Sequence, residues 1–394
     1  MMRAIASLNA GSSSIKFGVF VIGPLGLRRI VHGKVEGIGI APHFVVRGSR
    51  GDRLIDRTWP GGAGLEHEEL LSQLVDYAVE HLQHVEVVAV GHRVLHGGAE
   101  FQRPQLVDDA LLDALERLTR IAPLHQPHNL AAIRALRTLM PHLPQVACFD
   151  TEFHTSRPAV AKQYAVPIEW QEKGVRSHGF HGLSYEHIAA TLAATEPFLA
   201  RGRVLAAHLG NGASLCAFVD GRSVDTTMGF SVLDGLVMGS RCGSLDPAII
   251  LYMIREEGLS AEQVQAVLYR ESGLLGVSGL SSDMRVLQAS GDPRALDAIE
   301  LFVWRIVREI GALVSVMGGI DTLVFTGGIG ENDSRVRRAI CDRLGWLGLR
   351  LDPLANDRNE RVINASDSTV AIRLIPADEE RMIALHCDRL LALS

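Results

Sequence analysis

The sequence has only five cysteines and no Cys-x-x-Cys pair, and none of its apolar runs is long enough to cross a membrane. An odd number of scattered cysteines excludes a disulfide framework and a cysteine-type zinc site, and it favours a reducing compartment. The apolar N-terminus, residues 1–23, is interrupted by Asn9, a serine run and Lys16, and the apolar run at 310–320 ends at Asp321. We therefore expect a cytoplasmic protein that is neither exported nor inserted into a membrane.

Two common nucleotide-binding signatures are also missing. The sequence contains neither Gly-x-x-x-x-Gly-Lys-Ser/Thr nor a Gly-x-Gly-x-x-Gly that opens a helix, which excludes the P-loop and the Rossmann fingerprint. A net charge of −6 provides no attraction to nucleic acid or to an anionic membrane, so neither is expected as a partner. The 394 residues, of which 47% are apolar, are enough for two domains with sizable cores.

The chain does contain three Gly-rich turns, each after an apolar strand, at residues 6–17, 207–215 and 322–332. The first two return as a second strand, whereas the third is a loop that precedes a helical stretch from Ser334. Glycine lets backbone N–H groups approach an anion, because no Cβ stands in the way. Three such turns indicate a nucleotide held from several sides, as in a kinase, although each alone also fits an ordinary hairpin or loop. The residues of the first turn that could contact phosphate are Asn9, Gly11, Ser12, Ser14 and Lys16.

The order of expected elements repeats along the chain. After a hairpin that ends at residue 22, the expected strands are 31–38, 44–47, 85–92 and 145–149, and the expected helices are 64–84, 108–121 and 129–139. A similar order restarts with a hairpin at 204–219, followed by helices at 247–257, 261–269 and 294–317 and a strand at 322–325. This pattern predicts mixed sheets flanked by helices, and the likeness of residues 8–15 to 209–215 suggests an internal duplication.

Short motifs along the chain together resemble the acetate kinase family. Among them are Asn9-Ala-Gly-Ser-Ser-Ser-Ile-Lys16, Gly91-His-Arg-Val-Leu-His-Gly-Gly98, Phe149-Asp-Thr-Glu-Phe-His154, Gly239-Ser-Arg-Cys-Gly243 and Thr326-Gly-Gly-Ile-Gly-Glu-Asn332. They follow the family order from residue 9 to Glu380 and so cover nearly the whole chain. The resemblance implies an α/β fold with two ribonuclease-H-like domains, of the actin-like ATPase kind, that face each other across a nucleotide cleft.

The resemblance also implies a domain organisation and an activity. An N-terminal acyl and phosphate domain would cover residues 1–150 and a C-terminal nucleotide-binding domain 151–379, with a C-terminal helix, 380–394, packed back on the first domain. The expected reaction is ATP + acetate ⇌ ADP + acetyl phosphate, by direct in-line transfer with Mg²⁺, which Mn²⁺ can replace. Related enzymes are typically homodimers joined through the C-terminal domain, to which the apolar stretch 301–316 would contribute unless it is core.

The residues that the motif matches assign to catalysis are Arg93, His125, Asp150, His181 and Arg241. The two arginines would bracket the substrate carboxylate and the transferring phosphoryl group, since guanidinium groups stay charged and donate in planar forks. The two histidines would donate to the phosphoryl oxygens. A carboxylic acid substrate is already ionised at neutral pH. We therefore expect Asp150 to orient Mg²⁺ or an arginine rather than to act as a base, and its structural alternative is a helix N-cap.

The remaining site residues follow from the same matches. Asn9 and Glu379 would bind magnesium, which keeps most of its waters. The substrate pocket would be formed by Arg93, Leu95, Leu124, Phe180 and Val232. The nucleotide would contact Lys16, His208, Leu209, Gly210, Asn211, Gly212, Asp283, Met284, Arg285, Gly328, Ile329, Gly330, Glu331 and Asn332.

The sequence departs from the family pattern around the acyl pocket. Leu95 stands where Val is usual and Val232 where Pro is usual, while His178 replaces a Tyr and Tyr185 replaces a His. One methylene in such a pocket changes binding by only about 1–3 kcal/mol. Propionate or another short-chain acid is therefore an alternative substrate.

Three further interpretations are weaker. A non-catalytic, actin-like nucleotide-binding protein would not need two arginines and two histidines at matching positions. A sugar kinase would use an aspartate base on a hydroxyl group, whereas the arginines suit a carboxylate better. The His-x-x-His spacings at 125–128 and 178–181 lack the acidic or cysteine companions of a zinc site.

Overall fold

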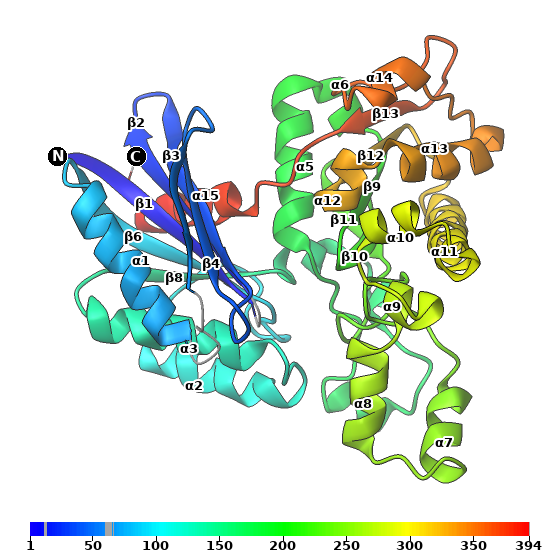
Figure 1. Ribbon diagram of the computed structural model, residues 1–394, viewed down its shortest axis with the longest axis horizontal. Helices are drawn as coiled ribbons and strands as arrows, with labels where there is room; N and C mark the ends of the chain where they lie inside the picture. The colour runs from blue at the N-terminus through cyan, green and yellow to red at the C-terminus, as the bar shows by residue number, and fades with distance from the viewer. Residues whose placement is uncertain (12–13, 60–64, 66, 394) are drawn as a thin grey trace. The chain divides into compact units, whose positions relative to one another are not determined.

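The computed structural model describes residues 1–11, 14–59, 65 and 67–393. The chain forms two compact units (Figure 1). The N-terminal unit consists of Met1–Glu152 together with the segment from Asp378 to the C-terminus, and the C-terminal unit consists of Phe153–Ala377. Among the described residues, no helix combines the length and apolar character that a membrane span requires.

The N-terminal unit is built on one mixed sheet, with the strand order β5-β4-β3-β2-β1-β6-β8-β7. Its strands are β1 (Met2–Ala10), β2 (Ser14–Gly23), β3 (Gly26–Glu36), β4 (His43–Gly48), β5 (Arg53–Thr58), β6 (Val85–Val94), β7 (Gln105–Leu106) and β8 (Gln145–Phe149). Strands β1 to β5 form an antiparallel meander, whereas β6 runs parallel to β1 and β8 parallel to β6. The predicted strands are confirmed; Ser12 of the first predicted turn and the start of the predicted helix 64–84 lie outside the described residues.

Helices cover both faces of this sheet. The helices are α1 (His67–His81), α2 (Asp109–Arg117), α3 (Gln126–Leu139) and α15 (Glu379–Leu391). Helices α1 and α3 pack on the face that carries Ala4, Leu8 and Phe17. Side chains alternate along β1 and β6, so the opposite face carries Ser7, Asn9, Gly91 and Arg93, and α15 packs there. At Gly91 a Cβ would lie 2.4 Å from the Ile383 side chain of α15, so a larger residue at this position would have to displace side chains of that helix.

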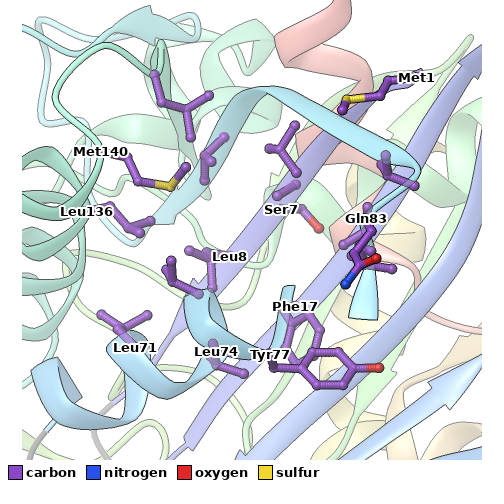
Figure 2. A pocket seen from close by; sticks show the side chains of 18 residues that line it. Met1, Ser7, Leu8, Phe17, Leu71, Leu74, Tyr77, Gln83, Leu136 and Met140 are labelled. Atoms are coloured by element: carbon purple, nitrogen blue, oxygen red, sulfur yellow. The ribbon is translucent and has the colours of Figure 1, made fainter. Parts of the chain in front are cut away.

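An apolar cavity of about 270 Å³ lies between α1, α3 and the sheet (Figure 2). Leu71, Leu74 and Tyr77 of α1, Leu136 of α3 and Phe17 of β2 line it. Close packing is the rule in protein interiors, so added methyl groups should find contacts here without displacing their neighbours.

Filling this cavity is expected to stabilise the chain. Ala6 of β1 lines the cavity and points to the same face as Ala4 and Leu8. Ala6→Ile adds apolar contacts and a β-branched residue to a strand, and it should raise the free energy of unfolding by about 1 kcal/mol. Urea unfolding measures the change. The matched control is Ala132→Ile on α3, which is 1% exposed in the same core and does not line the cavity; overpacking should cost about 1–3 kcal/mol there. A decrease for both variants would contradict the prediction.

The C-terminal unit has a five-stranded sheet with the order β11-β10-β9-β12-β13. Its strands are β9 (Arg203–Leu209), β10 (Ala213–Val219), β11 (Arg222–Thr226), β12 (Thr322–Thr326) and β13 (Ala371–Leu374). The first three are antiparallel, and β12 runs parallel to both β9 and β13. The N-terminal sheet has the same order and directions in β3-β2-β1-β6-β8. The two units thus repeat one topology, as the similar hairpins suggested.

The helices of the C-terminal unit agree with the sequence in most places. They are α4 (Ile168–Glu172), α5 (Gly182–Thr195), α6 (Pro197–Ala200), α7 (Pro247–Arg255), α8 (Ala261–Arg270), α9 (Gly273–Ser278), α10 (Met284–Ser290), α11 (Pro293–Met317), α12 (Gly327–Asn332), α13 (Ser334–Arg343) and α14 (Pro353–Asp357). Residues Phe302, Ile306 and Ile310 of α11 are buried, whereas Trp304 and Val316 are 59% and 57% exposed, so the apolar stretch 301–316 is core on one face only. The third Gly-rich turn, expected to be a loop, is helix α12, because the Glu331 carboxylate accepts from the Gly327 N–H at 3.0 Å and caps the turn.

Candidate active site

A cluster of polar and charged side chains around Arg93 lies where β1 and β6 end in the N-terminal unit. Arg93 Nε donates to Asp150 Oδ2 at 2.9 Å, and Nη2 donates to the same oxygen. Arg93 Nη1 donates to Asn9 Oδ1 at 3.2 Å, and Asn9 Nδ2 donates to Glu379 Oε2 at 3.1 Å. The Arg93 side chain is 15% exposed and Asp150 is fully buried. The structure therefore brings together four predicted site residues, one of them from the far end of the chain.

Charge holds this cluster together. Burial by itself would lower the pKa of Arg93, but the carboxylates of Asp150 and Glu379 outweigh burial and raise that pKa above its ordinary value. The Arg93 guanidinium consequently remains charged. Burial, reinforced by the Glu379 carboxylate, raises the pKa of Glu380. Lys16 lies across the hairpin from Asn9 and is exposed, and its charge acts on Glu380.

A buried asparagine that sequence reasoning missed joins the two strands carrying Asn9 and Arg93. Asn129 of α3 donates from Nδ2 to the Ala10 carbonyl at 2.6 Å, and its Oδ1 accepts from the Leu95 N–H at 2.9 Å. One side chain thereby binds the backbone of the last residue of β1 and of the residue just after β6. Nothing in the local sequence marks this role, because both partners are distant in the chain.

The side-chain oxygens of this cluster are suitable ligands for magnesium. Asn9 and Glu379 offer amide and carboxylate oxygens, the hard ligands that Mg²⁺ prefers. Among the described residues, no group of three or more His, Cys, Asp or Glu is arranged to hold a metal ion. A magnesium ion bound by this pair would therefore draw its remaining ligands from water or phosphate, as is usual for Mg²⁺ in kinases.

A histidine pair lies in the C-terminal unit, between α5 and the hairpin β9-β10. His181 is the residue just before α5 and has a left-handed backbone, with φ of 57°. Its ring stacks on the ring of His208, with centroids 4.2 Å apart and planes at 19°. Ser214 Oγ lies 2.8 Å from His181 Nδ1, and Ser184 Oγ lies 2.9 Å from His208 Nδ1. A serine thus anchors each ring on one nitrogen.

The glycine turn of this hairpin passes between the histidines and Arg241. A Cβ at Gly212 would lie 3.0 Å from Arg241 Nη2 and 3.5 Å from His181 Nε2. Arg241 Nη1 donates to the Val232 carbonyl at 2.8 Å, and the Gly239 N–H donates to the Asn211 carbonyl at 3.0 Å. The turn, His181 and Arg241 therefore meet at one place.

A pocket of about 700 Å³ opens beside this turn. Eight of the predicted nucleotide contacts line it: Gly210, Asn211, Asp283, Met284, Arg285, Gly328, Ile329 and Asn332. Sequence reasoning missed five further lining residues: Ser282, Gln288, Asp333, Ser334 and Arg335. Their positions beside predicted contacts are the signal that could have identified them. The volume is that of a typical small-molecule site.

The other predicted nucleotide contacts lie elsewhere. Leu209 is fully buried in β9. Glu331 accepts from the N–H groups of Gly327 and Ala377, and the Gly330 carbonyl accepts from Arg337 at 2.9 Å. Glu331 and Gly330 belong to the contacts that hold helix α12, and none of the three residues lines the pocket.

The four apolar residues predicted for the substrate pocket divide between the units. Leu95 and Leu124 belong to the N-terminal unit, and Phe180 and Val232 belong to the C-terminal unit. Leu95, Phe180 and Val232 are buried, whereas Leu124 is half-buried. His125, which directly follows Leu124, begins helix α3 as its N-cap residue.

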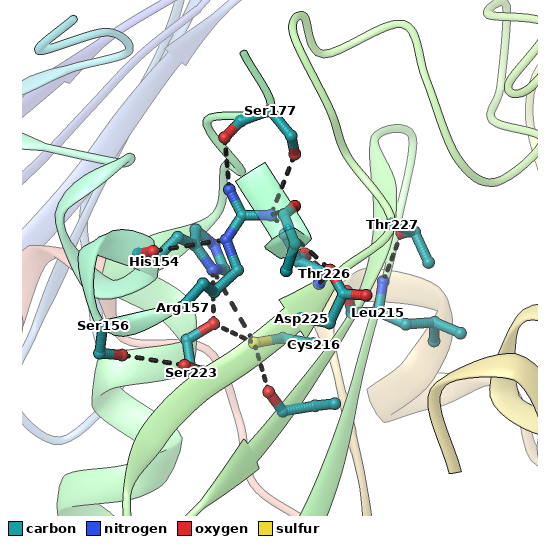
Figure 3. Close-up of polar contacts among 12 residues, drawn as sticks. His154, Ser156, Arg157, Ser177, Leu215, Cys216, Ser223, Asp225, Thr226 and Thr227 are labelled. Atoms are coloured by element: carbon teal, nitrogen blue, oxygen red, sulfur yellow. Dashed lines mark hydrogen bonds and ion pairs between the residues drawn. The ribbon is translucent and has the colours of Figure 1, made fainter. Parts of the chain in front are cut away.

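A buried polar cluster holds the segment 177–181, which carries His181 (Figure 3). Arg157 Nη1 donates to Ser177 Oγ at 3.0 Å, and Nη2 donates to the Ser177 carbonyl at 2.6 Å. Asp225 lies 3.7 Å from Arg157 Nη1 as its charge partner. Sequence reasoning gave Arg157 no role, because its partners are known only from the fold.

His154 fixes the other end of this segment. Its Nε2 donates to the Phe180 carbonyl at 2.9 Å, and its Nδ1 lies 3.0 Å from Ser223 Oγ. Burial, reinforced by the Arg157 charge, lowers the pKa of His154 to about 3. A Cβ at Gly179, where φ is 80°, would lie 2.6 Å from the His154 ring. The neutral ring and the glycine together fit the segment closely against the sheet.

Comparison with known proteins places these observations in a family. Residues 4–385 match the acetokinase family. An acetate kinase of Rhodopseudomonas palustris is 50% identical over 99% of both chains, and one of Coprothermobacter proteolyticus is 42% identical over 96% of this chain and 97% of that one.

Two solved structures extend the likeness to the fold. A propionate kinase of Francisella tularensis has a TM-score of 0.89 at 37% identity, over 98% of this chain and 99% of that one. An acetate kinase of Porphyromonas gingivalis has a TM-score of 0.86 at 32% identity, over the whole of both. The predicted fold class, two ribonuclease-H-like domains of the actin-like ATPase kind, is thereby confirmed. The chain belongs to the acetokinase family.

Proposed function

We propose that this chain is an acetate kinase, which reversibly transfers the γ-phosphoryl group of ATP to acetate and yields acetyl phosphate and ADP. The observation that carries the proposal is the cluster at Arg93, in which Asp150 and Asn9 fix a largely buried guanidinium. A guanidinium group that is held in place and always charged binds a carboxylate or phosphoryl oxygens well, because its N–H groups donate in parallel. The curated acetate kinases at up to 50% identity support the same reaction.

The protein contributes position and charge to a direct in-line transfer. Arg93 and Arg241 neutralise the charge of the carboxylate and of the transferring phosphoryl group, and His125 and His181 donate hydrogen bonds to its oxygens. Asp150 accepts both hydrogen bonds of one edge of Arg93, so its role is to orient that arginine. No covalent enzyme intermediate is needed, because phosphoryl transfer requires little beyond positioning and neutralisation.

Magnesium and the nucleotide complete the site. Asn9 and Glu379 hold Mg²⁺, for which Mn²⁺ can substitute, and the ion supplies charge neutralisation to the phosphates. The adenosine side of ATP occupies the 700 Å³ pocket between Asp283–Arg285 and α12. The N-terminal unit serves the acyl and phosphate groups, and the C-terminal unit serves the nucleotide.

A second candidate is a propionate kinase or a kinase of another short-chain acid. Val232 at the predicted acyl pocket favours it, because the proline usual in the family is lost there and the pocket is loosened, whereas Leu95, larger than the usual Val, tightens the other side. The Francisella tularensis structure at 37% identity is a propionate kinase. Such a pocket separates acids that differ by one methylene by only about 1–3 kcal/mol.

Trapping the acyl phosphate with hydroxylamine tests the function. The chain is incubated with ATP, Mg²⁺ and acetate, propionate or butyrate, and the hydroxamate is quantified. We expect the highest kcat/KM for acetate and its loss in Arg93→Ala. A higher kcat/KM for propionate would assign the second candidate. Formation of ADP without hydroxamate from any acid would refute both.

We further propose that the protein is a homodimer joined through helix α7. This helix is rich in apolar residues, yet none of its residues is buried in the chain, and Ile249 and Tyr252 are 40% and 54% exposed. Exposed apolar surface of this kind marks an interaction site. Six residues of 301–316 are buried in the chain, whereas no residue of α7 is, so we place the interface on α7.

Charges on α7 are expected to separate the subunits. The double variant Ile249→Arg/Tyr252→Arg should halve the molar mass measured by light scattering, because two like-charged patches would meet at a symmetric interface. Leu25→Arg changes an exposed apolar residue of the N-terminal unit and should leave the mass unchanged. A dimeric double variant, or a monomeric wild-type chain, would refute the interface.

A further inference from the structure

We propose that Asn129 is a positioning residue that fixes the places of Asn9, Arg93 and His125 through hydrogen bonds to the main chain of three separate elements. The inference rests on the proposed function in one respect, namely that these three residues serve phosphoryl transfer. It assigns a part in that reaction to a buried amide that no motif match singled out.

The first step is the place where two paired strands part. Strands β1 and β6 are parallel neighbours, and the pairing between them ends at Leu8 and His92. Asn9 and Arg93 are the next residues along the two strands. Their side chains meet, since Arg93 Nη1 donates to Asn9 Oδ1 at 3.2 Å. This contact therefore depends on how the two strand ends are held relative to each other.

The second step is the bridge that Asn129 makes beyond this point. Its Nδ2 donates to the Ala10 carbonyl at 2.6 Å, and its Oδ1 accepts from the Leu95 N–H at 2.9 Å. A carbonyl only accepts and a backbone N–H only donates, so the two partners fix the orientation of the amide. Ala10 directly follows Asn9, and Leu95 comes shortly after Arg93. Asn129 thus joins the ends of β1 and β6 where their own pairing has stopped.

The third step is the helix that carries this side chain. Helix α3 packs on both strands (Figure 1), and His125 is its N-cap residue. The Asn129 N–H donates to the His125 carbonyl at 3.2 Å, which closes the first turn of the helix. Gln126 supports the same turn, because its buried amide donates to the His96 carbonyl at 3.2 Å. The main chain of Asn129 therefore holds His125, while its side chain holds both strand ends.

Burial makes the bridge difficult to replace. Asn129, Ala10 and Leu95 are each 3% exposed, so bulk water does not reach them as a substitute partner. A buried donor or acceptor that loses its partner costs free energy, and the strand ends would move to recover one. A shift of this kind at Asn9 and Arg93 is enough to affect catalysis, because a misplacement of about 1 Å can lower a rate about 100-fold.

Removing the bridge tests this role. Asn129→Leu keeps the approximate shape of the side chain but can neither donate nor accept. We expect the nitrogen-15 NMR signals of the Arg93 Nε–H and of the Asn9 side-chain amide to shift in the ligand-free protein, because their contact is displaced. We also expect kcat/KM for acetate to fall by about 10- to 100-fold. Asn129→Ser, in which one polar atom replaces two, should change both readouts in the same direction, which covers the case in which Asn129→Leu does not fold.

The matched control is Leu136→Ala on the same helix. Leu136 is also 3% exposed, and its truncation weakens the packing of α3 without removing a hydrogen bond of Asn129. Urea unfolding should show a loss of stability, whereas the Arg93 and Asn9 signals and kcat/KM should keep their wild-type values.

Wild-type signals of Arg93 and Asn9 in a folded Asn129 variant would overturn the inference, and so would an equal kinetic loss in Leu136→Ala. A wild-type chain that forms no acyl phosphate would remove the proposed function, whereas the NMR signals would still decide whether Asn129 holds Asn9 and Arg93 in place.

Discussion

Asp150→Asn is expected to lower kcat/KM for acetate by at least about 100-fold, the effect of losing a group that fixes a main catalytic charge. The Asp150 carboxylate is fully buried and accepts from both Nε and Nη2 of Arg93. An asparagine of the same shape offers one neutral acceptor, so Arg93 would keep its charge but lose its fixed direction. Steady-state kinetics with acetate as the varied substrate measures the change.

The pH profile separates an orienting role from a role as general base. A base would give kcat an acidic limb that disappears in Asp150→Asn, whereas an orienting carboxylate leaves the shape of the profile intact and lowers its height. We expect the second result, because an ionised acceptor has no proton to lose. Asp109→Asn is the control, since that aspartate pairs with Arg137 at the surface. Loss of the acidic limb would contradict the orienting role.

Folding must be measured beside activity. Breaking a buried ion pair typically costs about 3–5 kcal/mol, but Glu379 lies 3.9 Å from Arg93 and would still neutralise part of its charge. Circular dichroism and urea unfolding of Asp150→Asn therefore show whether the kinetic loss belongs to a folded enzyme.

Local patterns predicted the regular elements well. Strand β8 has the predicted bounds, because a short apolar run between polar residues is typical of a buried strand. Helix α11 begins within one residue of its predicted start, at Pro293 after the N-cap Asp292. Strand β5 was missed, since it is an exposed edge strand without apolar alternation. Helix α12 was missed because its glycines favour a loop unless Glu331 caps it.

The candidate site was predictable only in its residue types and their matches to family motifs. The contact of Asn9 with Glu379 joins residues at opposite ends of the chain, and no local pattern contains it. The same holds for Asn129, and for Arg157, whose guanidinium is satisfied by Ser177. The tertiary fold determines which buried polar groups become hydrogen-bond partners, whereas sequence patterns indicate mainly which faces of helices and strands are apolar.

Acid is expected to destabilise the chain steeply between pH 6.5 and 4, through three buried histidines. Burial lowers the pKa of His92 and of His96 to about 4, and burial together with Arg157 lowers the pKa of His154 to about 3, from an ordinary value of 6.5. Below pH 6.5 the unfolded chain binds protons that the folded chain does not, so the free energy of unfolding falls as pH falls. The loss ends once the folded histidines also titrate, near pH 3 to 4.

The expected slope is large. Each such histidine contributes about 1.4 kcal/mol per pH unit, so three contribute about 4 kcal/mol per unit against a usual total of about 5–15 kcal/mol. Asp225, Glu309 and Glu380 act in the opposite sense, because burial raises the pKa of each and lets the folded chain take up protons early. These carboxylates offset part of the slope, and we expect the histidines to set its sign from pH 6.5 downward.

Urea unfolding at pH 7, 6 and 5 measures this dependence, and one substitution identifies its source. His92→Asn should lower stability at pH 7, yet it should reduce the slope by about one proton, or about 1.4 kcal/mol per pH unit. His142→Asn is the matched control, because water solvates that exposed ring in the folded and the unfolded chain alike. A flat wild-type profile, or an unchanged slope in His92→Asn, would show that these rings do not stay neutral in the fold. A steep wild-type profile would show that the histidine rings stay neutral in the folded chain. One of them is His154, whose ring donates to the Phe180 carbonyl next to His181, so protonation that unfolds the chain would also disrupt the support of His181.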